Sequence, residues 1–147
     1  MPDPPGPDRD IDWDRTVHGP LGIRTVELSP DRVVLTVSVT PAVHQPYGIL
    51  HGGVSALMAE SAASLGAAMA AGPGRTVVGI ELSASHLRPL RAGTLTATAT
   101  PVRRGRSVQV WEVSLTDDRR REICRARCTL SVFDAAAPRP DGESPAS

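Results

Sequence analysis

The sequence predicts an α+β domain in which an antiparallel sheet wraps around one long helix. An apolar, Ala-rich stretch at residues 53–71 is long enough for such a helix. Six shorter segments have the composition and alternation of strands, two before this helix and four after it. Short connections between successive strands favour antiparallel pairing, so the expected order is β-β-α-β-β-β-β.

The strands are predicted from alternating apolar residues and the turns between them. Residues 22–28 and 32–39 form the first pair, joined by the turn signal Ser29-Pro30-Asp31. Apolar residues occupy every second position from Val33 to Val39, as in a half-buried strand. The later strands are expected at residues 76–86, 94–103, 107–116 and 122–133.

The predicted helix carries one isolated carboxylate. It ends at Gly72-Pro73-Gly74, and Glu60 is the only charged residue between Gly52 and Pro73. Burying a carboxylate costs several kcal/mol unless the group is paired or used. Ser64 lies one helical turn after Glu60, so the two side chains can meet.

The chain of 147 residues fits one domain. Its two ends, residues 1–14 and 135–147, are rich in Pro, Asp, Gly, Ser and Ala, and we expect both to be disordered tails. The folded domain is therefore expected at residues 15–134.

Charge and hydropathy exclude several classes of partner. The 16 basic residues balance 16 acidic ones, so no overall field favours nucleic acid or a membrane surface. We expect no membrane-spanning helix. The N-terminus is acidic and Pro-rich, unlike a signal peptide, which predicts a cytoplasmic protein.

The two cysteines, Cys124 and Cys128, fall on one predicted strand. Four residues of extended chain separate them by roughly 13 Å, which is too far for a disulfide. A metal site would need more Cys or His ligands than this strand offers. We therefore predict two buried free thiols and no metal.

The segment from His44 to Gly53 is the most informative part of the sequence. It forms a glycine-bearing turn that delivers two glycines to the start of the helix. Unpaired N–H groups at a helix N-terminus stabilise developing negative charge, and glycine allows another molecule to approach the backbone closely. An anion hole followed by a lone base, Glu60, suggests acyl-group chemistry.

These residues resemble the hotdog-fold acyl-CoA thioesterases. More narrowly, they resemble the 4-hydroxybenzoyl-CoA thioesterase (PaaI-like) branch with a helix glutamate, and they are similar to the dihydroxynaphthoyl-CoA and enterobactin-proofreading thioesterases. The resemblance spans roughly residues 16–133 and is carried by 44–53, Ala59-Glu60-Ser61, 77–89, Gly105-Arg106-Ser107 and Trp111-Glu112-Val113.

The resemblance implies roles for particular residues. The Gly52 N–H would polarise the thioester carbonyl with Gln45 as a second donor, while Glu60 would act as nucleophile or general base. His51 would orient Gln45 or the thioester, and Ser64 would position Glu60 or water. Substrate contacts are implied for His86, Gly53, Ser83, Ser85, Arg88, Arg106 and Ser107. The resemblance implies no metal and no organic cofactor.

The spacing of Gly52 and Glu60 places a separate constraint on the site. Eight helical residues separate them by roughly 12 Å. Base and oxyanion donors must each lie about 3 Å from the reacting atoms, so the two residues cannot serve one carbonyl within a single chain. We therefore predict a homodimer with shared active sites. As a separate expectation, such dimers pair into a dimer of dimers, a homotetramer.

The expected reaction is hydrolysis of an acyl-CoA, with an aryl or other bulky acyl group, to the free acid and CoA. Three alternatives remain: hydrolysis of a carrier-protein thioester, a hotdog hydratase or dehydratase, and a non-catalytic acyl-CoA-binding protein. Retention of both Glu60 and Gly52 favours catalysis over binding alone. His18 and His44 are expected to be structural or exposed.

Overall fold

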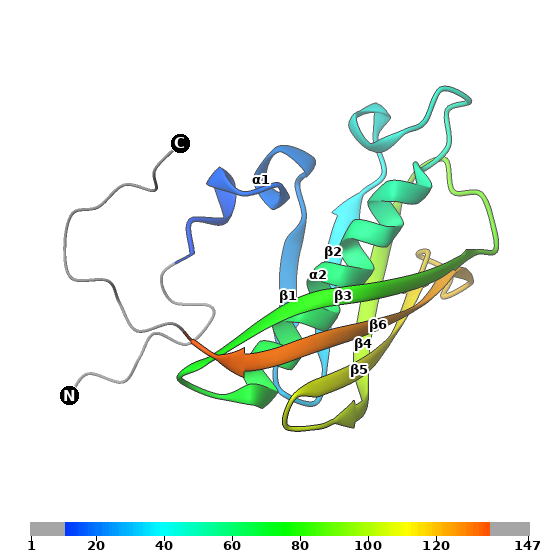
Figure 1. The fold of residues 1–147 in the computed structure, drawn as a ribbon. Coiled ribbons are helices and arrows are strands. Elements are labelled where there is room, and N and C mark those ends of the chain that lie inside the picture. Colours follow the sequence, from blue (N-terminus) through cyan, green and yellow to red (C-terminus); the bar gives the residue numbers. More distant parts are fainter. Residues whose placement is uncertain (1–10, 136–147) are drawn as a thin grey trace, which may run out of the picture.

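A six-stranded antiparallel sheet wraps around one long helix in the computed structural model, which describes residues 11–135 (Figure 1). The strand order is β1-β2-β4-β5-β6-β3. The main elements are β1 (Arg24–Leu28), β2 (Val33–Ser38), α2 (Gly52–Ala71), β3 (Arg75–His86), β4 (Thr94–Arg104), β5 (Val108–Thr116) and β6 (Glu122–Asp134). The predicted fold class and element order are confirmed.

Three short helical segments were not predicted: η1 (Trp13–Arg15), α1 (His18–Leu21) and η2 (Pro41–Val43). Most of the two predicted tails, residues 1–10 and 136–147, lies outside the described residues. Residues 11–14 were assigned to the N-terminal tail, yet Trp13 begins η1 and its ring stacks on His18. The packed part of the chain thus begins before the predicted boundary at residue 15.

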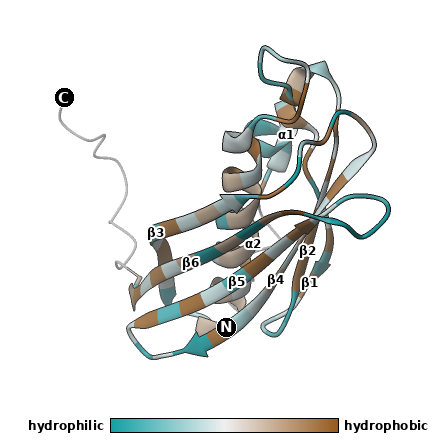
Figure 2. Ribbon diagram, turned by 90° about the vertical axis from the view of Figure 1, so that its right-hand side faces the viewer, coloured by the Kyte–Doolittle hydropathy of each residue, from teal (hydrophilic) through white to brown (hydrophobic). Residues whose placement is uncertain are grey.

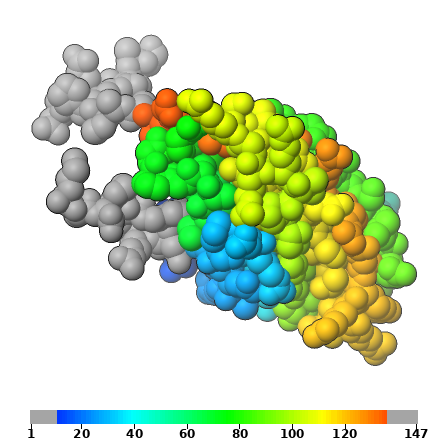
Figure 3. All heavy atoms as spheres, turned by 90° about the horizontal axis from the view of Figure 1, so that it is seen from below, coloured from blue at the N-terminus to red at the C-terminus, as the bar shows by residue number. Residues whose placement is uncertain are grey.

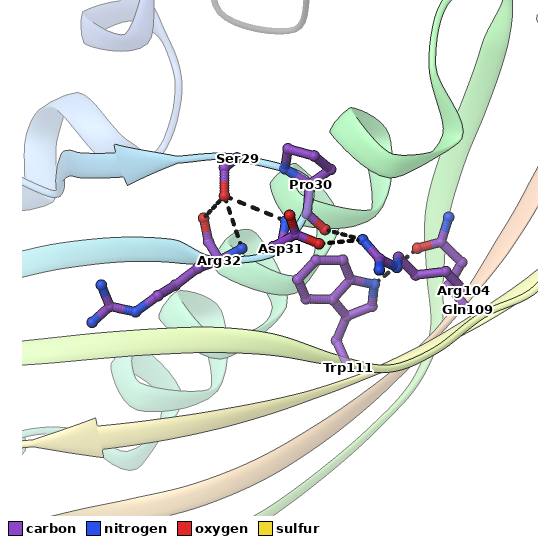
Figure 4. A network of polar contacts seen from close by, with 7 residues as sticks. All are labelled: Ser29, Pro30, Asp31, Arg32, Arg104, Gln109 and Trp111. Carbon is purple, nitrogen blue, oxygen red and sulfur yellow. Dashed lines mark hydrogen bonds and ion pairs between the residues drawn. The ribbon is translucent and has the colours of Figure 1, made fainter.

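Helix α2 packs its apolar face into the concave side of the sheet. Trp111 of β5 is fully buried, and its indole lies against Gly66, where a Cβ would come within 2.5 Å of the ring. Its Nε1 donates a hydrogen bond of 2.9 Å to the side chain of Gln109 (Figure 4). The Gln109 amide in turn donates to the Ala67 carbonyl. Trp111 is thus a core residue that ties the helix to the sheet.

Alternation along the strands separates the two faces of the sheet. Leu95, Ala97 and Ala99 of β4 are fully buried beneath α2, as are Val113 and Leu115 of β5. The intervening residues face outward, so apolar and polar bands alternate along the ribbon (Figure 2). This period of two fixes which side chains can reach the helix.

One end of the molecule is closed by contacts between segments distant in sequence. The β1–β2 turn, the end of α2 and the β4–β5 hairpin lie side by side in Figure 3. Arg104 on the hairpin donates to the Pro30 carbonyl at 3.0 Å and to Asp31 at 2.6 Å in the turn (Figure 4). These contacts pin the first hairpin to the rest of the sheet.

Strand β3 lies at the edge of the sheet and pairs only with β6. Its register shifts between Gly79 and Glu81, which marks a bulge. Near this point Val78 and Ile80 are 44% and 60% exposed. A long edge strand that exposes apolar side chains is a surface for pairing with another chain.

Helix α2 is long and apolar enough to cross a membrane by length and composition. It makes contacts with all six strands of the sheet, and eight of its residues are buried. These contacts identify it as the core helix of the domain.

Candidate active site

The segment before α2 is a tight loop held by backbone hydrogen bonds. His44 and Leu50 form an antiparallel bridge, and the Gln45 N–H donates to the Ile49 carbonyl at 2.8 Å. Gly48 has φ +73°, a left-handed conformation that side chains disfavour. The loop therefore presents Gln45 beside the first turn of the helix.

His51 caps the helix and leaves one backbone donor free. Its Nδ1 accepts a hydrogen bond of 2.8 Å from the Gly53 N–H. Because an accepting ring nitrogen carries no proton, the neutral ring holds its proton on Nε2. Among the described residues, no group accepts a hydrogen bond from the Gly52 N–H. Gly52, rather than Gly53, thus offers the available donor.

Gly52 lies against the imidazole of His86 at the end of β3. A Cβ at position 52 would come within 2.9 Å of Nε2 of His86. The missing side chain allows the ring, or a substrate carbonyl, to approach the helix N-terminus closely. His86 therefore lies beside the N-terminus of α2, and its expected contact with the substrate stays a prediction.

The Gln45 side chain is oriented by its own loop. Its Oε1 accepts a hydrogen bond from the Tyr47 N–H, so the amide NH₂ points away from that contact and is available as a donor. Gln45, Gly52, His86 and Arg88 line one hollow of about 360 Å³. This hollow brings together two donors, an imidazole and a cation.

Glu60 lies in a different hollow. An open groove of about 580 Å³ runs along α2 and contains Glu60 and Ser64. Its other lining residues are largely apolar or aromatic: Ile11, Trp13, His18, Leu57, Ser61, Leu65, Ala68 and Val77. Glu60 is exposed to solvent in the single chain rather than buried.

Glycine at position 79 makes room for the carboxylate. A Cβ at Gly79 would lie 2.7 Å from Oε1 of Glu60. Glu60 therefore extends from α2 over the bare backbone of the edge strand β3. His86 is the last residue of β3, and the carboxylate lies over the same strand seven residues earlier, at Gly79.

The two halves of the expected site are thus separate within one chain. Gln45, Gly52 and His86 lie in the hollow at the N-terminus of α2, while Glu60 and Ser64 lie in the groove farther along it. The structure places them apart, as the spacing of eight residues requires.

The remaining predicted substrate residues lie in two other places. Leu82 and Ala84 pack against the core, so Ser83 and Ser85, which alternate with them, project to the opposite face of the sheet, away from both hollows. Arg106 lines a third hollow at the other end of α2. Within one chain this end is about 30 Å from Arg88, the length of a 20-residue helix.

The third hollow is basic. Arg75, Arg104 and Arg106 line it around Gly105, and Ser107 follows in the same hairpin. A guanidinium N–H of Arg75 donates to the Arg106 carbonyl at 3.0 Å, while its buried Nε has no partner among the described residues. Clustered arginines of this kind suit phosphate groups.

Both cysteine thiols are buried and free, as predicted. Burial, together with the nearby charges of Glu60 and Glu81, raises the pKa of Cys128 to about 11. Burial also raises the pKa of Cys124. Neither thiol is a nucleophile at neutral pH. Among residues 11–135, no cluster of three or more His, Cys, Asp or Glu could hold a metal.

Trp13, His18 and Ser61 line the groove that contains Glu60 but were not predicted there from the sequence. His18 is 5% exposed, its ring stacks on Trp13 at 4.9 Å, and its Nε2 lies 2.9 Å from Oγ of Ser61. Burial lowers the pKa of His18, which favours the neutral ring. His44 has a structural contact, from Nε2 to the Arg91 carbonyl. No local pattern links His18 to the groove, because the contact spans 43 residues.

Comparison with known proteins identifies relatives over most of the chain. A family model described as the thioesterase superfamily matches residues 47–124. A 1,4-dihydroxy-2-naphthoyl-CoA hydrolase of Listeria monocytogenes is 46% identical over 112 residues, 76% of this chain and 91% of that protein. The proofreading thioesterase EntH of Cronobacter turicensis is 38% identical over 113 residues, 77% and 82% of the two chains.

Solved structures of thioesterases also resemble this chain. A thioesterase of Haemophilus influenzae superposes with a TM-score of 0.80 at 38% identity, covering 83% of this chain and 85% of that one. A thioesterase protein from Streptococcus pneumoniae, solved with coenzyme A, has a TM-score of 0.71 at 23% identity over 78% and 88% of the chains. The latter likeness concerns the fold alone.

Proposed function

The chain belongs to the thioesterase superfamily and is a thioester hydrolase with the hotdog fold, and on this premise we propose that it hydrolyses an acyl-CoA with an aryl or other bulky acyl group. The products are the free acid and CoA. The observation that carries this proposal is the groove at Glu60, where a carboxylate and Ser64 adjoin a largely apolar lining. The name of the Listeria relative, a naphthoyl-CoA hydrolase, supports an aromatic acyl group on CoA.

The free Gly52 N–H and the Gln45 amide supply the electrophilic half of the proposed mechanism. Both lie in the hollow at the positive end of α2. A thioester carbonyl bound there would develop negative charge as it is attacked, and fixed donors stabilise that charge. His51, capping the helix through Nδ1, holds the Gly52 peptide in place and presents its Nε2 proton to Gln45 or the thioester.

Glu60 supplies the other half, either by removing a proton from water or by attacking the carbonyl carbon itself. Attack breaks the C–S bond, and the CoA thiolate leaves and takes up a proton. If Glu60 itself attacks, the acyl group is left on its carboxylate as a mixed anhydride. Water then hydrolyses this anhydride, which releases the acid and restores the carboxylate. Ser64, one turn along α2, can hydrogen-bond Glu60 or the water.

A second copy of the chain would unite the two halves. The edge strand β3 runs alongside both halves, because its His86 contacts Gly52 and its Gly79 contacts Glu60. In an antiparallel pair of β3 strands with the twofold axis between Leu82 and Ser83, His86 of one chain lies opposite Gly79 of the other. Gly52 would then meet the partner's Glu60, and the exposed Val78 and Ile80 would be covered.

The same pairing would bring the arginines together. Beyond its Gly79, the partner's strand continues to Arg75, which holds the loop of Arg106. Arg88 of one chain and Arg106 of the other would therefore lie at the same end of the shared site. We propose that they bind CoA phosphates, and that such dimers pair into a cytoplasmic tetramer.

A hydrolysis screen tests this function. Purified protein is assayed with aryl, branched and straight-chain acyl-CoAs, and the free CoA thiol is detected. We expect the best turnover with an aryl thioester and a loss on the order of 100-fold in kcat for Glu60→Gln, the usual scale for a general base. Near wild-type turnover by Glu60→Gln would contradict its role, and activity only on carrier-protein thioesters would contradict the substrate class.

A further inference from the structure

We propose that Ser61, positioned by His18, hydrogen-bonds a polar substituent on the acyl group and determines acyl specificity. This inference rests on the proposed function, since it places the acyl group in the groove of Glu60. It assigns a purpose to two polar residues that the proposed chemistry does not use.

The first observation is the position of Ser61. It follows Glu60 directly in α2 and lines the same groove, three residues before Ser64. An acyl group whose carbonyl carbon lies within reach of Glu60 would therefore lie alongside Ser61. The surrounding walls are formed mainly by apolar side chains, so this hydroxyl is one of the few polar contacts the groove offers to the acyl group.

The second observation is the hydrogen bond that holds this hydroxyl. Oγ of Ser61 lies 2.9 Å from Nε2 of His18, whose ring is stacked on Trp13 at an interplanar angle of 15°. Burial lowers the pKa of His18, so the ring is neutral near pH 7. The Ser61 rotamer is thus fixed by a buried, rigid partner rather than by solvent.

The third observation is hydrogen-bonding capacity. A serine hydroxyl has one donor and two acceptor sites, and the contact with His18 uses one of them. Among the described residues, no other group hydrogen-bonds Oγ of Ser61. A hydroxyl or similar polar substituent on the acyl group can occupy a remaining site. A site built for such a contact disfavours acyl groups that lack it.

The roles of the two residues differ in kind. Ser61 touches the acyl group and is the specificity residue. His18 acts through Ser61 and is a positioning residue. Replacing either should lower selectivity, and replacing both should cost no more selectivity than replacing Ser61 alone, because the two share one interaction.

The experiment compares benzoyl-CoA with 2-, 3- and 4-hydroxybenzoyl-CoA. For each, kcat/KM is measured with wild type, Ser61→Ala, His18→Leu, His18→Gln, the Ser61→Ala/His18→Leu double variant, and Ser38→Ala as an exposed control. We expect wild type to prefer at least one hydroxylated substrate by about threefold to tenfold, the scale of one neutral hydrogen bond. Ser61→Ala and His18→Leu should abolish this preference while hydrolysing benzoyl-CoA within a few-fold of wild type.

Several results distinguish this role from a structural one. His18→Gln should retain part of the preference, since an amide can hydrogen-bond Ser61. An unchanged preference in Ser61→Ala, or an equal loss on all four substrates, would overturn the inference while leaving the proposed function intact. A wild type that hydrolyses none of the four would overturn the inference, and it would contradict the proposed function as well if the other acyl-CoAs of the hydrolysis screen also stay intact. Melting temperatures of each variant show whether a uniform loss reflects unfolding.

Discussion

Individual glycines in this protein make room for particular groups. Gly52 admits the His86 ring at the helix N-terminus, and Gly79 admits the Glu60 carboxylate over β3. Neither has a positive φ, so space rather than backbone conformation explains glycine at both positions. A sequence identifies such residues as glycines but does not reveal which side chain faces them.

Gly79→Ala should lower activity without unfolding the protein. The new Cβ would come within 2.7 Å of Oε1 of Glu60, and the flexible carboxylate would move rather than the strand. A displacement near 1 Å at a catalytic group costs roughly 100-fold in rate. We expect kcat to fall at least tenfold while the melting temperature by circular dichroism stays within a few degrees. Wild-type kcat in this variant would show that Glu60 acts from another rotamer.

At the scale of elements, the longer strands and the central helix could be predicted to within about two residues. Their apolar periodicity is local, and it is interrupted by clear turn signals such as Ser29-Pro30-Asp31 and Gly72-Pro73-Gly74. The short segments η1, α1 and η2 could not, because one helical turn shows no periodicity.

The residues of the candidate site also differ in whether a local pattern could predict them. The residues at Gly52 and Glu60 belong to continuous motifs, whereas His18 reaches the groove only through a contact 43 residues away. The resemblance also implied substrate contacts for both Arg88 and Arg106. Within one chain they lie at opposite ends of α2, because β4 and β5 carry Arg106 away from the loop of Arg88.

Gly66→Ala tests how the central helix packs against the sheet. In an exposed helix this change stabilises by about 1 kcal/mol. Here the added methyl would come within 2.5 Å of the buried Trp111 indole. We therefore expect a loss of about 1–3 kcal/mol in unfolding free energy, typical of overpacking, measured by urea denaturation.

The double variant Gly66→Ala/Trp111→Phe is the matched control for this packing. Phenylalanine leaves space for the methyl, so the double variant should lose less stability than the sum of the two single variants. Additive losses, or a stabilised Gly66→Ala, would contradict the packing described here.

At the scale of the whole molecule, the single chain holds the parts of the proposed active site without assembling them. Donors lie at one end of β3 and the carboxylate lies near its middle. The same edge strand exposes apolar side chains, so one pairing event would cover these and complete two sites.

The proposed dimer predicts how Arg88 and Arg106 affect kinetics. Phosphates far from the thioester contribute mainly uniform binding, which lowers KM without changing the chemical step. Replacing either residue with Ala should raise KM for acyl-CoA and leave kcat within a few-fold. An acyl-pantetheine substrate, which lacks the nucleotide phosphates, should be almost unaffected. Equal losses on both substrates would mean that these arginines support the fold.

Complementation tests whether each site needs two chains. Gln45→Ala and Glu60→Ala proteins should each be nearly inactive as homodimers, because every site carries one lesion. In a mixed dimer one site carries both lesions and the other carries neither. With equal amounts and full subunit exchange, half of the dimers are mixed, so activity should recover to about a quarter of wild type.

Exchange is verified by mass spectrometry with one isotopically labelled variant, and a mixture of two Glu60→Ala preparations serves as the control that should stay inactive. A third mixture, wild type with the Gln45→Ala/Glu60→Ala double variant, separates shared sites from single-chain sites. If sites are shared, every site of that mixed dimer carries one lesion, and exchange should reduce the wild-type activity by about half. If each site is built from one chain, exchange should leave that activity unchanged and the complementing mixture should stay inactive.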